Sequence, residues 1–173
     1  MKKNFQKILH CLILSCILIE ISAQREAAAL INWKESLNTA SLPSWNLSNT
    51  SGSPCKWTGI SCNEASSIVE IINLSNSSLG GTLNRFDFSA FPSLTSLNLS
   101  SNTLVGEIPR GIGNATKLIR LDLARNNFTN SIPIEIGNLL EFDMSLMNQI
   151  PSQLSNLQKL QLLDLGGNYL RGS

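Results

Sequence analysis

The chain has 173 residues, 42% of them apolar and 14% charged, a composition typical of one folded domain with a modest core rather than of a disordered segment. The formal net charge is +1, and the part after residue 23 is close to −1, because three of the 13 basic and one of the 12 acidic residues precede it. This balance offers no basic surface for nucleic acid, so no such partner is expected.

Residues 1–23 have the pattern of a secretory signal peptide. Three lysines among the first seven residues precede an apolar run over residues 8–19, and the small residues Ser22 and Ala23 follow it. We expect cleavage after Ala23 and export of the remainder. The alternative is a membrane anchor, but about twelve apolar residues are fewer than the roughly 20 that a spanning helix needs.

Residues 24–67 differ from the rest of the chain. Apolar residues recur at helical spacing between Glu26 and Leu37, which predicts a short amphipathic helix followed by a loop rich in Ser, Asn and Pro. All three tryptophans lie in this segment, at Trp33, Trp45 and Trp57. We interpret them as core residues that close one end of the domain, with an aromatic ligand site as the less favoured alternative.

The cysteines that remain after leader removal are Cys55 and Cys62. An even number in an exported chain favours a disulfide, and a pair of free thiols is the alternative. A metal site is less favoured, because the only histidine, His10, lies in the leader and two thiolates do not complete a tetrahedral zinc site. No cofactor is expected.

The rest of the chain repeats itself. One pattern occurs twice, 24 residues apart, in residues 94–113 and 118–137, with the shared positions Leu94/Leu118, Leu97/Leu121, Leu99/Leu123, Asn102/Asn126, Leu104/Phe128, Ile108/Ile132, Pro109/Pro133, Ile112/Ile136 and Gly113/Gly137. An earlier copy begins at Val69, and a later one begins at Leu160, 42 residues after its counterpart. We place a shortened unit between Gly137 and Ile150, whose residues Phe142, Asp143 and Met144 imitate the strand but lack the asparagine.

The spacing of this pattern predicts stacked coils. A Leu-x-Leu step has the period of two of a half-buried strand, and one such strand cannot cover its own core, so successive units stack with parallel strands on one face. The asparagine turns the chain out of the strand, where its amide can pair with buried backbone groups of neighbouring coils. Because nothing visible covers the final coil, we expect its leucines, Leu160, Leu163, Leu165 and Leu170, to be partly exposed.

Two motifs carry a resemblance to a known family. The string Pro54-Cys55-Lys56-Trp57-Thr58-Gly59-Ile60-Ser61-Cys62 resembles the N-terminal cap of plant leucine-rich repeat proteins, and Gly106-Glu107-Ile108-Pro109 resembles the plant-specific repeat signature, which adds a second short strand. Together the resemblance covers about residues 26–173. It is strongest to receptor-like kinases and receptor-like proteins, and the stretch 73–113 looks most like the male-discoverer-interacting type.

The resemblance implies an α/β solenoid: a leucine-rich repeat arc with a parallel β-sheet on its concave face, preceded by a disulfide-bonded helical cap. The expected domains are the leader, the cap over 24–67, and four to five repeats over 68–173, one of them shortened. It also implies a ligand face, a membrane helix and an intracellular Ser/Thr kinase. The last two are not visible in this sequence, so we expect either an incomplete receptor or a short secreted relative.

The expected ligand site lies at outward positions of the strands, where the candidates are Arg120, Asp122, Arg125 and Asp164. Catalysis is not expected, because the chain after the leader has no histidine for a nucleophile–base pair. Asp122 and Asp164 could imitate a catalytic carboxylate pair, but the repeat alignment predicts an intervening coil that separates them by more than the roughly 5–10 Å such pairs use.

Seven Asn-x-Ser/Thr motifs support the secretory interpretation and are candidates for N-linked sugar, at Asn46, Asn49, Asn73, Asn76, Asn98, Asn114 and Asn127. We therefore expect an extracellular recognition module in signalling or defence, in the apoplast or at the plasma membrane. Its partners would be a peptide or protein ligand and a co-receptor ectodomain. The alternatives are a secreted inhibitor of the polygalacturonase-inhibiting type and a co-receptor scaffold.

Overall fold

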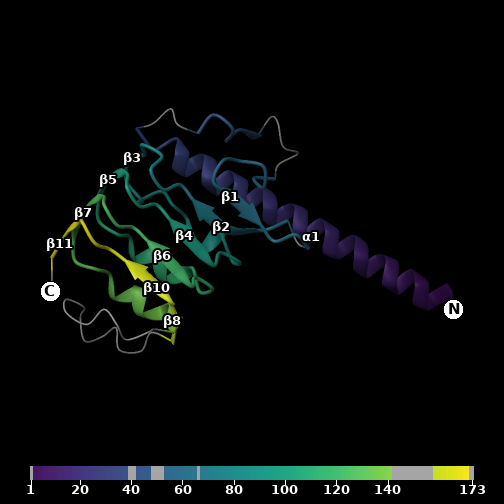
Figure 1. The fold of residues 1–173 in the computed structure, drawn as a ribbon. Coiled ribbons are helices and arrows are strands. Elements are labelled where there is room, and N and C mark those ends of the chain that lie inside the picture. The colour runs from purple at the N-terminus through teal and green to yellow at the C-terminus, as the bar shows by residue number, and fades with distance from the viewer. Residues whose placement is uncertain (1, 39–41, 48–52, 66, 142–157, 172–173) are drawn as a thin grey trace.

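The computed structural model describes residues 2–38, 42–47, 53–65, 67–141 and 158–171. Within these residues, a long helix, α1 (Lys2–Lys34), is followed by short strands in three sheets and by the 3₁₀ helices η2 (Phe88–Ala90), η3 (Arg110–Asn114) and η4 (Ile134–Asn138). The coils stack away from the helix, so that the N-terminus and the end of the chain lie on opposite sides of the molecule (Figure 1).

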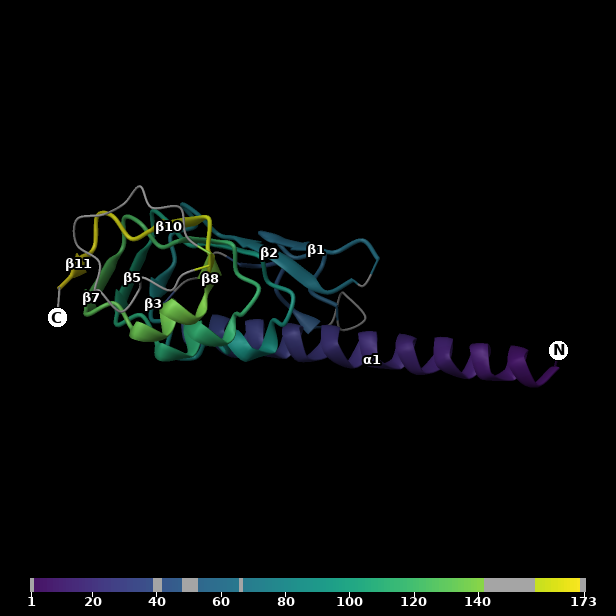
Figure 2. The ribbon, with the colours of Figure 1, turned by 90° about the horizontal axis from the view of Figure 1, so that it is seen from below.

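Helix α1 is longer than the expected helix over 26–37. It runs without interruption from Lys2 to Lys34, because no glycine or proline occurs in this stretch. Its first half projects from the body (Figures 1 and 2), with Leu14, Leu18 and Ile21 exposed, and Ala23 is the first buried residue among the side chains that the structure describes. Within the described ranges, no helix has the length and apolar character required to cross a bilayer. Helix α1 continues through the expected cleavage point after Ala23, and leader removal stays a prediction.

The larger sheet has five strands in the order β1-β2-β4-β6-β10. Its strands are β1 (Ile60–Cys62), β2 (Val69–Asn73), β4 (Ser96–Asn98), β6 (Arg120–Asp122) and β10 (Leu162–Asp164). The pairs among β2, β4, β6 and β10 are parallel, whereas β1 of the cap pairs with β2 antiparallel. This parallel sheet lines the concave face of the arc, as the repeat spacing and the resemblance predicted.

A second sheet flanks the first, in the order β11-β7-β5-β3. It consists of β3 (Gly80–Gly81), β5 (Thr103–Gly106), β7 (Asn127–Asn130) and β11 (Tyr169–Leu170). It contains the second short strand that the plant-type signature implied, because β5 leads directly into Glu107-Ile108-Pro109. The 3₁₀ helices lie on the side of the arc opposite the five-stranded sheet (Figure 2).

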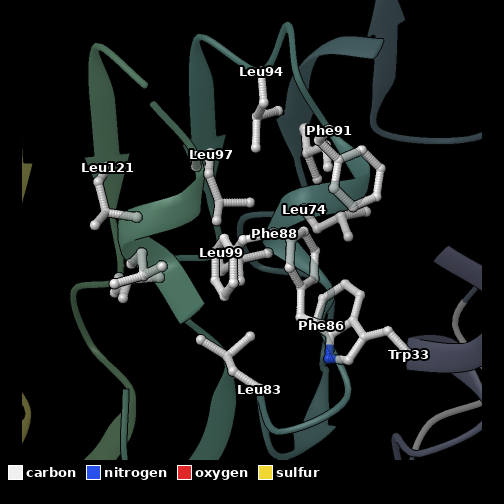
Figure 3. Packing of buried hydrophobic residues seen from close by; sticks show 14 of the residues in the cluster. Trp33, Leu74, Leu83, Phe86, Phe88, Phe91, Leu94, Leu97, Leu99 and Leu121 are labelled. Carbon is white, nitrogen blue, oxygen red and sulfur yellow. The ribbon is translucent and has the colours of Figure 1, made fainter. Parts of the chain in front are cut away.

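The cap closes the first coil with aromatic side chains. Trp33 of α1 packs edge-on against Phe86 with 4.9 Å between ring centroids, and Phe86 contacts Phe88 and Phe91 (Figure 3). Trp45 and Trp57 stack on each other at 5.6 Å, and all three tryptophans are buried. Their interpretation as core residues is therefore confirmed. The Cys55–Cys62 disulfide, with its Cα atoms 5.5 Å apart, links the loop to β1.

The asparagine ladder joins successive coils, as predicted. The Asn102 amide donates to the carbonyls of Leu74 and Leu99, and its Oδ1 accepts the N–H of Leu79. Asn126 repeats the arrangement one coil later, with bonds from Nδ2 to Leu99 and Leu123 and from the Leu104 N–H to Oδ1. Each buried amide thus pairs backbone groups that would otherwise be unsatisfied.

The last coil stacks directly on the third. Strand β10 pairs with β6 in register, Leu163 with Leu121, and Asn168 bonds to the Leu123 carbonyl as the next asparagine of the ladder. The predicted shortened unit falls mostly on residues 142–157, including Phe142, Asp143 and Met144, which lie outside the described residues. On either side of residues 142–157, β8 (Leu140–Glu141) pairs antiparallel with β9 (Gln158–Lys159).

The exposure expected for the last coil is only partly correct. Leu165 and Leu170 are half-buried, as expected, but Leu160 and Leu163 are buried. Leu163 is covered from the side of the third coil by the in-register pairing of β10 with β6. Leu162 and Tyr169, which point outward, are 44% and 67% exposed.

Candidate functional site

The concave face presents two rows of outward side chains that run across the strands. One row consists of the Cα partners Ile71, Ser96, Arg120 and Leu162, and the other consists of Asn73, Asn98, Asp122 and Asp164. Neighbouring strands lie about 4.8 Å apart, so each side chain stands beside its counterpart in the next coil. Side chains at equivalent positions of successive coils therefore form continuous rows across the concave face.

The second row ends each strand with the same turn. The side-chain Oδ1 accepts the backbone N–H two residues later, from Ser75 to Asn73 at 3.2 Å, from Ser100 to Asn98 at 2.9 Å, from Ala124 to Asp122 at 3.1 Å, and from Gly166 to Asp164 at 2.9 Å. Because amides and carboxylates make the same bond, the turn needs one acceptor oxygen and no charge.

Asp122 and Asp164 lie on adjacent strands, so the expectation of an intervening coil between them is wrong. The two residues are Cα partners in the β6–β10 pair, because β10 takes the next place in the sheet after β6. Distance therefore gives no argument against a carboxylate pair. The shared turn instead assigns one oxygen of each to the backbone. Across the described residues, no three His, Cys, Asp or Glu side chains gather as metal ligands.

Arg120 and Arg125 flank these carboxylates. Arg120 is exposed in the middle of the face, between Ser96 and Leu162. Arg125 lies beyond β6 and not on the strand as predicted: its φ of 54° places it in the left-handed turn that follows. Its N–H donates to the Gly166 carbonyl at 2.7 Å, and its side chain passes over Gly167, whose added Cβ would lie 3.4 Å from the Arg125 Cγ.

The two arginines form no ion pair with the described residues. In the parts of the chain that the structure describes, the one ion pair within 4.0 Å joins Arg110 to Glu135, on η3 and η4. Neither Arg120 nor Arg125 is compensated there, and both side chains are exposed. The face over β6 and β10, together with the turn after β6, thus combines two guanidinium groups with two carboxylates.

Glu26 is a titratable residue that the sequence analysis did not single out. It lies on the buried face of α1, where its Oε2 accepts the Val69 N–H at the start of β2 at 3.0 Å. Its Oε1 is buried without a hydrogen-bond partner in the structure. Burial raises the pKa of Glu26 to about 7, although the bond from Val69 opposes the rise. Its spacing with Leu30, Trp33 and Leu37 was the signal that it faces the core.

The acceptor asparagines occupy several environments. Asn73, Asn76, Asn114 and Asn127 are exposed, whereas Asn46 and Asn98 are half-buried, and Asn49 lies outside the described residues. Asn46 is the least open, because its Nδ2 donates to the Pro43 carbonyl and its Oδ1 is buried without a partner.

Comparison with known proteins agrees with this architecture. A model of the leucine rich repeat N-terminal domain matches residues 23–63, and the leucine rich repeat model matches residues 93–115 and 117–139. The leucine-rich repeat receptor-like serine/threonine-protein kinase RGI4 of Arabidopsis thaliana is 38% identical over 117 residues, which are 66% of this chain and 10% of RGI4. The chain thus spans about a tenth of the length of this relative.

Solved structures give the same result. The BIR3–SERK2 complex from Arabidopsis thaliana matches with a TM-score of 0.67 and 37% identity over 83% of this chain and 82% of that one. The PEPR1–AtPEP1 structure matches with a TM-score of 0.67 and 28% identity over 85% of this chain and 18% of that one. With its cap, its disulfide, its asparagine ladder and its two sheets, the chain belongs to the plant leucine-rich repeat receptors, in the region of their ectodomains.

Proposed function

We propose that this ectodomain region recognises a peptide or protein ligand on its concave face, as part of a receptor in signalling or defence. The observation that carries the proposal is the cluster of Arg120, Asp122, Arg125 and Asp164, which are brought together by the direct pairing of β6 with β10. Charged groups that no ion pair compensates favour a partner of complementary charge, because they steer its approach and fix its register. The BIR3–SERK2 complex adds the possibility of a co-receptor ectodomain as partner.

The proposal includes export. Residues 1–23 would be removed as a leader, residues 24–67 would form the cap, and residues 68–173 would form the repeats, with the shortened unit at 137–150. The protein would then lie in the apoplast or at the plasma membrane, with any kinase activity in a separate region of a longer receptor. Mass spectrometry of the exported protein should place Gln24 at the new N-terminus. The finer assignment to the male-discoverer-interacting type stays a prediction, because RGI4 matches as well.

A peptide library displayed on phage, selected on the exported protein, tests the binding face. Selected peptides should lose affinity for the variant Arg120→Glu in a salt-dependent manner and keep it for Lys117→Glu, whose charge lies between η3 and β6. Equal losses in the two variants would contradict the placement of the site. Inhibition of a polygalacturonase by the same protein would instead support the inhibitor alternative.

A further inference from the structure

The asparagines of the repeats fall into two structural classes. Those of the ladder, Asn102, Asn126 and Asn168, use both ends of the side-chain amide, because Oδ1 accepts and Nδ2 donates to backbone groups of neighbouring coils. None of the three is followed by serine or threonine at the second position. A sugar on any of these Nδ2 atoms would break the ladder.

Asn73 and Asn98 belong to the other class. Each engages only Oδ1, which accepts the backbone N–H and also the hydroxyl of the serine two residues later, at 3.0 Å from Ser75 Oγ and at 2.7 Å from Ser100 Oγ. Over the described ranges, neither Nδ2 donates a hydrogen bond to the protein. A substituent on Nδ2 therefore leaves the turn intact, and the serines that hold the turn are the same serines that complete the acceptor motif.

Asn73 and Asn98 are also neighbours on the concave face. Asn73 and Asn98 are Cα partners on β2 and β4, so their Nδ2 atoms stand side by side at about the spacing of neighbouring strands, roughly 4.8 Å. That spacing is comparable with the thickness of a sugar ring. The same row continues on β6 and β10 as Asp122 and Asp164, with Ala124 and Gly166 in place of the serines. These two positions cannot accept N-linked sugar.

We propose that Asn73 and Asn98 both carry N-linked glycans, which cover the concave face over β2 and β4 and leave the face over β6 and β10 open. The inference rests on the export that is part of the proposed function. It restricts that function further, because a ligand then reaches the charged half of the face, and not the half near the cap.

The test uses the exported protein, released from its glycans with peptide N-glycosidase in ¹⁸O water, which converts each modified asparagine to labelled aspartate. Mass spectrometry should find the label at both Asn73 and Asn98. The variants Ser75→Ala and Ser100→Ala remove the motif but keep the backbone N–H bond of the turn, and each should lose one glycan. The matched controls Ser75→Thr and Ser100→Thr keep the motif and should keep the glycan.

The results separate this inference from the proposed function. Label at Asn114 and Asn127 with unmodified Asn73 or Asn98 would overturn the proposal that glycans cover the face over β2 and β4, but it would leave the proposed export intact. Absence of label at every acceptor would overturn both. As a further check, Asp122→Asn combined with Ala124→Ser transfers the motif to β6 without losing the acceptor of the turn. It should add one glycan to a folded, exported protein and abolish binding of the phage-selected peptides, and unchanged binding would place the ligand elsewhere.

Discussion

The buried carboxyl of Glu26 should make the stability of the cap depend on pH. Its pKa is about 7 in the folded chain and 4.5 at its ordinary value, so the folded state holds the proton over an interval in which the unfolded state has lost it. The contribution of the protonated Glu26 to the free energy of unfolding is therefore fully present below pH 4.5, and it is lost as the pH rises to about 7. At 1.36 kcal/mol for each pH unit, the interval corresponds to about 3 kcal/mol.

Replacement of Glu26 by glutamine should remove this dependence. The glutamine oxygen can still accept the Val69 N–H, but its amino group takes the place of Oε1, which has no partner, so the variant carries a constant penalty at every pH. The informative quantity is consequently the slope with pH and not the absolute stability. Between pH 4.5 and 7.5, the wild type should lose about 3 kcal/mol relative to Glu26→Gln.

Urea unfolding followed by tryptophan fluorescence measures this directly, because Trp33, Trp45 and Trp57 are all buried in the cap. A tag should replace residues 1–23, since an α-ammonium at Gln24 would stand two residues from the carboxyl and lower its pKa. Glu64→Gln, at an exposed carboxyl, controls for the loss of one negative charge. Parallel slopes for wild type and Glu26→Gln would refute the account of Glu26 as a buried acid.

Two further substitutions test the packing. Asn126→Ala leaves the buried N–H of Leu104 without its partner and removes one of the two amide donors to the carbonyls of Leu99 and Leu123, so it should cost about 2–3 kcal/mol. Asn84→Ala, at an exposed asparagine, should change stability by less than about 0.5 kcal/mol in the same urea titration. Cys55→Ser opens the loop to Cys62 and should cost about 2–3 kcal/mol, and thiol labelling of native wild-type protein at both positions would contradict the disulfide.

Periodicity predicted the repeats well because each buried position has a fixed spacing. Leu97, Leu121 and Leu163 occupy equivalent places in the sheet, and the ladder asparagines bond as their place after the strand implies. The same reasoning failed for the order of coils, because a count of residues does not reveal whether a shortened unit contributes a strand to the sheet. The adjacency of Asp122 and Asp164 is therefore visible only in the register of β10 against β6.

The outline of the candidate site was only partly predictable. Arg120 and Asp122 were correctly placed on the face, but Arg125 turned out to occupy a left-handed turn, where Asn76, Ser101 and Gly167 stand in the other coils. In an alignment of the repeats, Arg125 occupies the same position as those three residues, and Asn and Gly at that position indicate a left-handed turn. The role of Glu26 was less accessible, because an acid on an apolar helix face can either pair with another charge or remain protonated. The structure favours the second state, because burial raises the pKa of Glu26 and no opposite charge contributes to that pKa.

The last coil should open more readily than the coil before it. Equivalent backbone hydrogen bonds of the same length lead to each of these two coils, so their protection can be compared within one molecule. The amide of Leu99 donates to Asp122 of a coil that is covered on both sides, and the amide of Leu123 donates at the same 2.8 Å to Asp164 of the last described coil. In that coil Leu165 and Leu170 are only half-buried, whereas their counterparts Leu123 and Phe128 are fully buried. Local opening of the last coil thus exposes less apolar surface and costs less free energy. Amide exchange should accordingly be faster at Leu123 and Arg125 than at Leu99 and Ser101, as measured by mass spectrometry or NMR under native conditions. Equal protection would mean that the last coil opens only with the whole array, and that half-burial of its leucines does not weaken it.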